Sequence, residues 1–114
     1  MPSLPANARA LLEPALDAGE TFTWADVEAR ILNNTAQLWL GERCAIVTEL
    51  YPGLIHVWLA GGDLSGLMAL RPRIEETARV WGCETVTING RPGWDRLFKP
   101  YGYRRVGTEL EKKL

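Results

Sequence analysis

The sequence predicts a mixed α/β fold in which an antiparallel meander is followed by a parallel strand. Three observations predict it. Segments rich in β-branched and apolar residues occur at 36–40, 44–51 and 54–60, with only short turns between them. A helical pattern of about 18 residues comes next. A further β-rich segment at 84–88 follows that helix, and a helical crossover is the usual connection between two parallel strands.

Two helices are expected before the sheet. Residues 6–18 are helix-prone, and Ala8, Leu12 and Leu16 are spaced to form one buried face, although Pro14 weakens the pattern. A second helix is expected after Thr23, because threonine is a good N-cap residue and Asp26 supplies an acidic first turn.

The long crossover helix is expected to begin at Gly61-Gly62-Asp63, which should break the third strand, and to end at Gly82. Pro72 is expected to kink or split this helix, because proline removes a backbone donor and clashes with the preceding turn. Its apolar positions are Leu64, Leu67, Met68, Ile74, Ala78 and Trp81. Its water-facing side is assigned the charged residues Arg71, Arg73, Glu75, Glu76 and Arg79.

The C-terminal third is expected to add a loop, a short helix and one strand. The loop contains Gly90, Pro92 and Gly93, and the helix is marked by Trp94, Leu97, Phe98 and Tyr101. Residues 103–110 are the predicted last strand, and residues 111–113 are a solvated tail.

Composition limits the function. A chain of 114 residues with 46% hydrophobic residues suits a single domain over residues 1–114. A net charge of −1 argues against a protein built for nonspecific nucleic-acid binding. No apolar run approaches the roughly 20 residues of a membrane span, and the N-terminus lacks a signal-peptide pattern. We therefore expect a cytoplasmic protein in which Cys44 and Cys83 are reduced core residues.

Known catalytic motifs are missing from the sequence. One histidine and two distant cysteines do not give metal-ligand spacing, and no GxSxG, HExxH or Walker sequence occurs.

The order of these elements resembles the GNAT N-acetyltransferase superfamily over roughly residues 24–110. The strongest local likeness is the segment Leu97-Phe98-Lys99-Pro100-Tyr101-Gly102-Tyr103-Arg104, which is similar to a late segment of that family. The Gly-Gly-Asp after the third strand and the Gly-Trp before the last helix resemble short GNAT-like proteins of bacteriophages. The resemblance implies an acyl-CoA-dependent N-acyltransferase.

The resemblance implies that acetyl-CoA binds at the start of the long helix, where unpaired amides favour phosphate. The corresponding residues here are Ala60, Gly61, Gly62, Leu64, Ser65 and Gly66. This loop departs from the family's pattern, since no Arg or Gln precedes the glycines and the spacing differs. Asp63 adds a carboxylate, and the alternative interpretation makes it simply the N-cap of the helix.

The catalytic candidates are His56, Tyr103 and Tyr101. His56 lies on the third strand, where the family often places a base, and an imidazole titrates near neutral pH. Strand alternation puts it on one face with Leu54, Trp58 and Ala60. The family's acidic tyrosine corresponds to Phe98, so Tyr103 or Tyr101 would have to replace it. The alternatives are a half-buried structural histidine and aromatic rings that cap the core, and Glu49 is a weaker base candidate.

Five tryptophans in a short chain suggest a partner surface. Trp58 and Trp81 are assigned to the core, Trp24 is expected to be half-buried, and Trp39 and Trp94 are candidates for a homodimer or protein contact. Arg91, Arg96, Lys99, Arg104 and Arg105 form a basic region that is either a solvated face or a contact for the CoA 3′-phosphate, an acidic partner or a nucleic acid. Two functions stay open: an acyltransferase, and a noncatalytic GNAT-like protein acting in phage virion assembly or as an interaction module.

Overall fold

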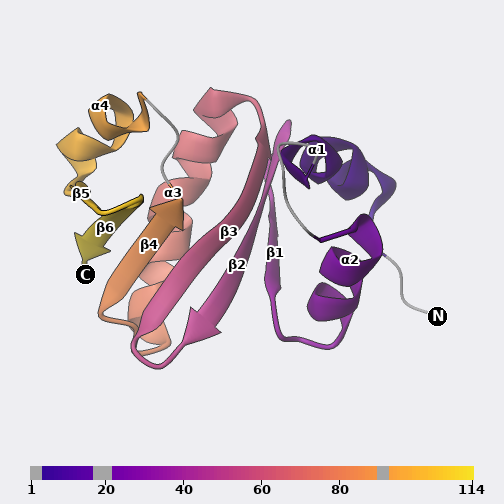
Figure 1. Ribbon diagram of the computed structural model, residues 1–114, viewed down its shortest axis with the longest axis horizontal. Helices are drawn as coiled ribbons and strands as arrows, with labels where there is room; N and C mark the ends of the chain where they lie inside the picture. The colour runs from indigo at the N-terminus through magenta and orange to yellow at the C-terminus, as the bar shows by residue number, and fades with distance from the viewer. Residues whose placement is uncertain (1–3, 17–21, 90–92) are drawn as a thin grey trace.

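One six-stranded sheet organises the chain, with the strand order β1-β2-β3-β4-β6-β5 (Figure 1). The computed structural model describes residues 4–16, 22–89 and 93–114. The strands are β1 (Gln37–Leu40), β2 (Cys44–Tyr51), β3 (Leu54–Gly62), β4 (Thr85–Asn89), β5 (Arg104–Val106) and β6 (Glu109–Lys113). The helices are α1 (Ala6–Leu16), α2 (Trp24–Leu32), α3 (Leu64–Val80), α4 (Trp94–Phe98) and the 3-10 turn η1 (Lys99–Tyr101).

The predicted fold class is confirmed. Strands β1, β2 and β3 form an antiparallel meander, and β4 pairs with β3 in parallel after the α3 crossover. Helices α1 and α2 cover one face of the sheet, and α3 and α4 lie on the other (Figure 1). Each face therefore has its own hydrophobic core. The core beneath α1 and α2 includes Leu12, Val27 and Val47, and the core beneath α3 includes Ile55, Ile74 and Val86.

Helix α2 begins as the sequence predicts. The Thr23 hydroxyl accepts a hydrogen bond from the Asp26 amide, and the Asp26 carboxylate accepts one from the Thr23 amide at 2.8 Å. This reciprocal capping box satisfies two amides that the first turn would otherwise leave unpaired. The Thr23 amide and the Thr23 hydroxyl both donate to the Asp26 carboxylate, and these two bonds lower the pKa of that carboxyl below its ordinary value.

The expected split at Pro72 is wrong, because α3 runs without interruption from Leu64 to Val80. Pro72 lies on the exposed side of the helix. There, water can bond the carbonyl that has lost its helical donor, so a proline need not end the helix.

The last strand is also different from the prediction. Residues 103–110 do not form one strand: β5 and β6 are joined by a turn in which Gly107 has a φ of 64°. Residues 111–113 are not a solvated tail, since β6 pairs with β4 from Asn89↔Glu109 to Thr85↔Lys113. The outer edge of β4 would otherwise expose a row of unpaired amides and carbonyls, and β6 covers it.

A bulge in β3 changes which residues face which core. Thr48 of β2 pairs with Val57, but Val47 pairs with Leu59, so Trp58 is an extra residue. The predicted alternation fails beyond this point: Trp58 and Leu59 pack beneath α1, whereas Ala60 packs beneath α3.

Candidate functional site

Strands β3 and β4 separate at the bulge. They pair only from Leu54↔Thr85 to Val57↔Ile88 among the described residues. Beyond Val57, β3 continues beside β2, while Asn89 of β4 pairs with β6. We call this opening the fork. It lies at the C-terminal ends of two parallel strands, which is where open α/β sheets bind their ligands.

A groove of about 370 Å³ lies at the mouth of the fork, and we call it the outer groove. Its walls come from α1, the end of β3, α3 and α4. They are formed by Ala10, Leu11, Pro14, Ala15, Ala60, Gly61, Gly62, Leu67 and Trp94. Three of the predicted cofactor residues, Ala60, Gly61 and Gly62, are therefore part of this groove.

Gly61 and Gly62 belong to β3 and do not break it, which corrects the sequence prediction. A Cβ on Gly61 would lie 1.9 Å from the Leu11 carbonyl oxygen, and one on Gly62 would lie 2.2 Å from the Arg43 carbonyl oxygen. Gly62 also has a φ of 105°, in the region that favours glycine. Close backbone packing therefore requires both glycines, whatever the groove binds.

The start of α3 borders a second groove, of about 210 Å³, which is lined by Glu42, Arg43, Asp63, Ser65 and Gly66. Asp63 occupies the N-cap position, but its side chain makes no capping hydrogen bond. Its carboxylate lies 4.0 Å from the Arg43 guanidinium. The simple N-cap interpretation of Asp63 is thus right in position only, and the first amides of α3 keep their capacity to bind an anion.

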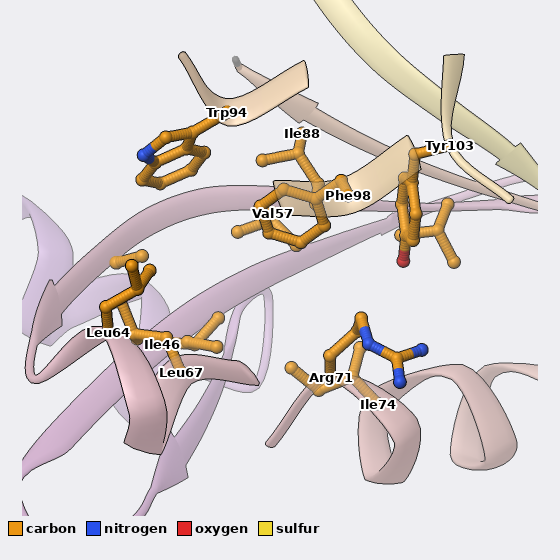
Figure 2. A pocket seen from close by; sticks show the side chains of 12 residues that line it. Ile46, Val57, Leu64, Leu67, Arg71, Ile74, Ile88, Trp94, Phe98 and Tyr103 are labelled. Carbon is orange, nitrogen blue, oxygen red and sulfur yellow. The ribbon is translucent and has the colours of Figure 1, made fainter. Parts of the chain in front are cut away.

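An apolar cavity of about 30 Å³ lies deeper, between α3, α4 and the sheet, and we call it the inner cavity. Figure 2 shows Trp94 and Phe98 of α4 above it and Leu64, Leu67 and Arg71 of α3 below. Ala60, Leu67 and Trp94 line both this cavity and the outer groove. The two spaces are therefore neighbours.

A buried ionic cluster lies next to the inner cavity. Glu75 is 3% exposed, and its carboxylate accepts hydrogen bonds from Lys112 at 2.7 Å, Tyr103 at 2.8 Å and Arg71 at 2.8 Å. Burial is the largest single effect and raises the pKa of Glu75. The three hydrogen bonds together outweigh it and lower the pKa below its ordinary value. The assignment of Arg71 and Glu75 to the water side of α3 is therefore wrong.

His56 lies one residue before the fork, on the sheet face opposite α3. Its Nδ1 lies 2.7 Å from the Thr87 hydroxyl and 3.4 Å from a Glu109 carboxylate oxygen. Its side chain is half-buried, with 15% exposed. Glu49, the weaker candidate, pairs with His56 across β2 and β3, but its carboxylate bonds Arg30 at 3.0 Å.

The two tyrosine candidates lie away from His56. Tyr103 is buried, and its hydroxyl donates to Glu75 on the α3 side of the sheet. Burial and the Glu75 carboxylate raise the pKa of Tyr103 well above its ordinary value, which makes the phenol a weaker acid. Tyr101 is 43% exposed, and the Arg71 guanidinium stacks 3.9 Å from its ring centroid. The structure thus does not bring the three predicted catalytic residues together.

The tryptophans differ in part from the prediction. Trp58 is buried as expected, and Trp24 is more deeply buried than expected at 8% exposure. Trp81 is not a core residue: it is 47% exposed and lies beside Trp39 with ring centroids 6.1 Å apart.

In the basic region, Arg105 bonds Asp95 at 2.7 Å. Arg91 and the expected 90–92 loop lie outside the described residues.

Several site residues were missed at the sequence level. Arg71 is four residues after Leu67 and three before Ile74, so a charge on the apolar helical stripe was the available signal. Thr87 and Glu109 had no such signal. Thr87 meets His56 through the register of β4 on β3, and Glu109 reaches it through the register of β6 on β4. The sequence revealed neither register.

None of the described helices is long and apolar enough to cross a membrane. Within the same part of the chain, no three His, Cys, Asp or Glu side chains are grouped so that they could hold a metal ion.

Solved acetyltransferases share this architecture. An IAA acetyltransferase from Bacillus cereus aligns over 99% of this chain and 97% of its own, with a TM-score of 0.65 and 16% identity. A Bacillus subtilis acetyltransferase in complex with CoA aligns over 100% and 95%, with a TM-score of 0.59 and 14% identity. An N-acetyltransferase from Thermoplasma acidophilum in complex with coenzyme A aligns over 80% and 69%, with a TM-score of 0.57 and 13% identity.

The chain therefore has the fold of the GNAT acetyltransferases. No protein-family model matches the sequence, and no curated protein matches it significantly. Identities this low establish the fold alone, so a function must be argued from the site.

Proposed function

We propose that this protein is an N-acyltransferase that takes its acyl group from acyl-CoA and transfers it to an amine. The observation that carries the proposal is the fork, which opens onto the outer groove beside the start of α3. Two of the neighbours with this fold are complexes with coenzyme A, which supports the choice of ligand.

The residues present fit an acyl-CoA in two places. The outer groove has apolar walls around the exposed end of β3, which suits the extended thioester arm. The first amides of α3, with the Ser65 hydroxyl and the Arg43 guanidinium, form a donor set for a diphosphate. The Asp63 carboxylate opposes that charge, and its proximity to Arg43 reduces the repulsion.

The reaction forms a carbon–nitrogen bond between the acyl carbonyl and the amine and breaks the carbon–sulfur bond of the thioester. One proton leaves the nitrogen, and the sulfur of the released CoA takes up one. His56 is the residue we assign to the first of these transfers. When its Nδ1 carries the proton and donates to Thr87, the lone pair of Nε2 is available to accept a proton from the amine.

Thr87 and Glu109 are positioning residues in this proposal. Both oxygens lie on the Nδ1 side of the ring, so they fix its orientation and favour the protonated Nδ1. The role of Tyr103 or Tyr101 as the acid that protonates the leaving thiolate remains a prediction. The hydrogen bond from Tyr103 to Glu75 favours a structural role for Tyr103.

The first test is binding. A ligand present at 100 times its dissociation constant stabilises a protein by about 2.7 kcal/mol, so acetyl-CoA should raise the melting temperature measurably. Absence of any shift at millimolar CoA and acetyl-CoA would contradict the proposal. It would favour the alternative, a noncatalytic GNAT-like protein of phage assembly or an interaction module, for which the exposed Trp81 beside Trp39 is the candidate surface.

The second test is turnover with a panel of amines. His56→Gln should lower kcat by about a hundredfold or more, because a general base contributes on that order. Glu109→Gln should lower kcat less while leaving KM for acetyl-CoA unchanged. Glu84→Gln is the matched control, since Glu84 is an exposed glutamate at the other end of β4. Equal rates for His56→Gln and the native protein would eliminate His56 as the base.

A further inference from the structure

Among the described residues, the lining of the inner cavity has one charged side chain, Arg71, and is otherwise mostly apolar or aromatic. Trp94, Phe98 and Tyr103 are on one side, and Leu64, Leu67 and Ile74 are among the residues on the other. Figure 2 shows Arg71 rising from α3 toward the cavity, with its guanidinium beneath Tyr103. A half-buried arginine is an uncommon lining for an apolar space, because charged residues rarely lose water unless they are fully paired.

Arg71 is not fully paired. Its side chain is 15% exposed, one of its terminal nitrogens bonds Glu75 at 2.8 Å, and its guanidinium carbon stacks over Tyr101. Its Nε is buried and has no hydrogen-bond partner among the described residues. Buried donors are nearly always satisfied, so this Nε requires an acceptor, which is either a water molecule or a group of a bound ligand.

The charges around this donor are also unbalanced. Arg71 and Lys112 bring two positive charges to the single carboxylate of Glu75, and the side chains are 15%, 16% and 5% exposed. Tyr103 is neutral and acts as a donor to the same carboxylate. One additional negative charge would neutralise the cluster. An acceptor that carries a negative charge therefore suits this position better than a neutral one.

The inner cavity adjoins the acyl-transfer site. Leu67 lines both the outer groove and the cavity, and Arg71 is one helical turn further along α3, which is about 6 Å. A short chain that starts at the fork can therefore reach Arg71. The cavity volume of about 30 Å³ is about twice what one water molecule needs, so it has room for a carboxylate group but not for a whole acyl chain.

We propose that the inner cavity selects acyl groups that end in a carboxylate, such as a four-carbon dicarboxylic acyl chain, and that Arg71 Nε donates to that carboxylate. The inference rests on the proposed acyltransferase function and specifies its donor. The methylene groups of the chain lie along Leu67 and Trp94, which the cavity shares with the outer groove. Only the terminal carboxylate enters the cavity, where it balances the charge of the Arg71, Lys112 and Glu75 cluster.

Calorimetry on the 114-residue chain with CoA, acetyl-CoA, butyryl-CoA and succinyl-CoA tests this directly. Butyryl-CoA is the matched probe, because it has the same number of acyl carbons and no carboxylate. We expect succinyl-CoA to bind at least tenfold more tightly than butyryl-CoA. Arg71→Lys keeps a cation for Glu75 but has no Nε donor. In this variant the ratio of the butyryl-CoA dissociation constant to the succinyl-CoA dissociation constant should fall toward one.

Arg79→Lys is the control, because Arg79 is an exposed arginine on the same helix and should leave the ratio unchanged. If Arg71→Lys does not fold, the affinity ratio in the native protein still tests whether the cavity selects acyl groups that end in a carboxylate. Equal affinity for succinyl-CoA and butyryl-CoA, with CoA bound, would overturn this inference alone and assign the Nε donor to cavity water. Failure of CoA and all three thioesters to bind would overturn the acyltransferase function as well.

Discussion

Removing the Glu75 carboxylate is the most direct test of the packing beneath α3. Glu75→Ala leaves Arg71 and Lys112 without their carboxylate, and both side chains are largely buried. Deleting one partner of a buried ion pair costs about 3–5 kcal/mol. Since both cations keep some access to water, we expect the lower end, about 3 kcal/mol, which lowers the melting temperature by roughly 12 °C at about 4 °C per kcal/mol.

Urea unfolding of Glu75→Ala and Glu76→Ala provides the measurement and its control. Glu76 is the adjacent residue, and it also pairs with an arginine of α3, at 3.2 Å from Arg79. Its side chain is 72% exposed, so its removal should cost under about 0.5 kcal/mol. Equal midpoints for the two variants would refute the reasoning, because burial is the main difference between the two pairs.

The same carboxylate makes stability depend on pH. The pKa of Glu75 is lower in the folded protein than its ordinary value of 4.5. Its contribution is therefore fully present above about pH 4.5 and is lost as the pH falls through the folded-state pKa. The stability difference between the native protein and Glu75→Ala should accordingly shrink below that pH. A difference that grows on acidification would contradict the direction of the shift.

Six further substitutions test glycine packing, helix capping and core burial by their unfolding free energies. Gly61→Ala places a Cβ 1.9 Å from the Leu11 carbonyl oxygen, so α1 must move and the cost should reach about 3 kcal/mol. Gly53→Ala meets no atom within 4 Å and should cost only about 1–2 kcal/mol from its φ of 70°. Thr23→Ala removes the capping box and should cost about 1 kcal/mol, which Thr23→Ser should restore. Trp58→Ala should cost about 3–5 kcal/mol and Trp81→Ala about half as much, and the reverse order would contradict their burial.

Local patterns predicted most of the architecture. β-Branched runs marked β2 and β3, and the helical stripe between Leu64 and Ala78 marked the crossover that makes β4 parallel to β3. These patterns succeed because each segment's periodicity reflects a face buried by its own neighbours. The predicted split of α3 at Pro72 was wrong, because a rule based on local sequence does not show that this proline faces water.

The candidate site was less predictable, because its residues meet through register. The bulge at Trp58 moves Ala60 to the α3 face, which simple alternation cannot show. Glu109 reaches His56 because the chain turns at Gly107 and β6 returns beside β4. A one-residue change in either register would turn these side chains to the other face of the sheet.

Glycine content alone is weak support for a phosphate loop in this protein. Backbone packing against Leu11 and Arg43 already requires Gly61 and Gly62, so the relevant feature is the charge at the start of α3. Asp63→Asn tests it, because asparagine is an equally good N-cap residue and lacks the negative charge. If a diphosphate binds at these amides, removing the Asp63 charge should tighten CoA binding about two- to fivefold, since a charge at a helix terminus contributes about 0.3–1 kcal/mol.

Arg43→Gln should weaken CoA binding by a similar factor, and added salt should reduce both effects because the groups are exposed. Dissociation constants for CoA at low and high ionic strength measure these changes. The control is pantetheine, which lacks the diphosphate and should bind both variants as it binds the native protein. Unchanged CoA affinity in Asp63→Asn and Arg43→Gln would place the diphosphate away from α3, even if the thioester arm occupies the fork.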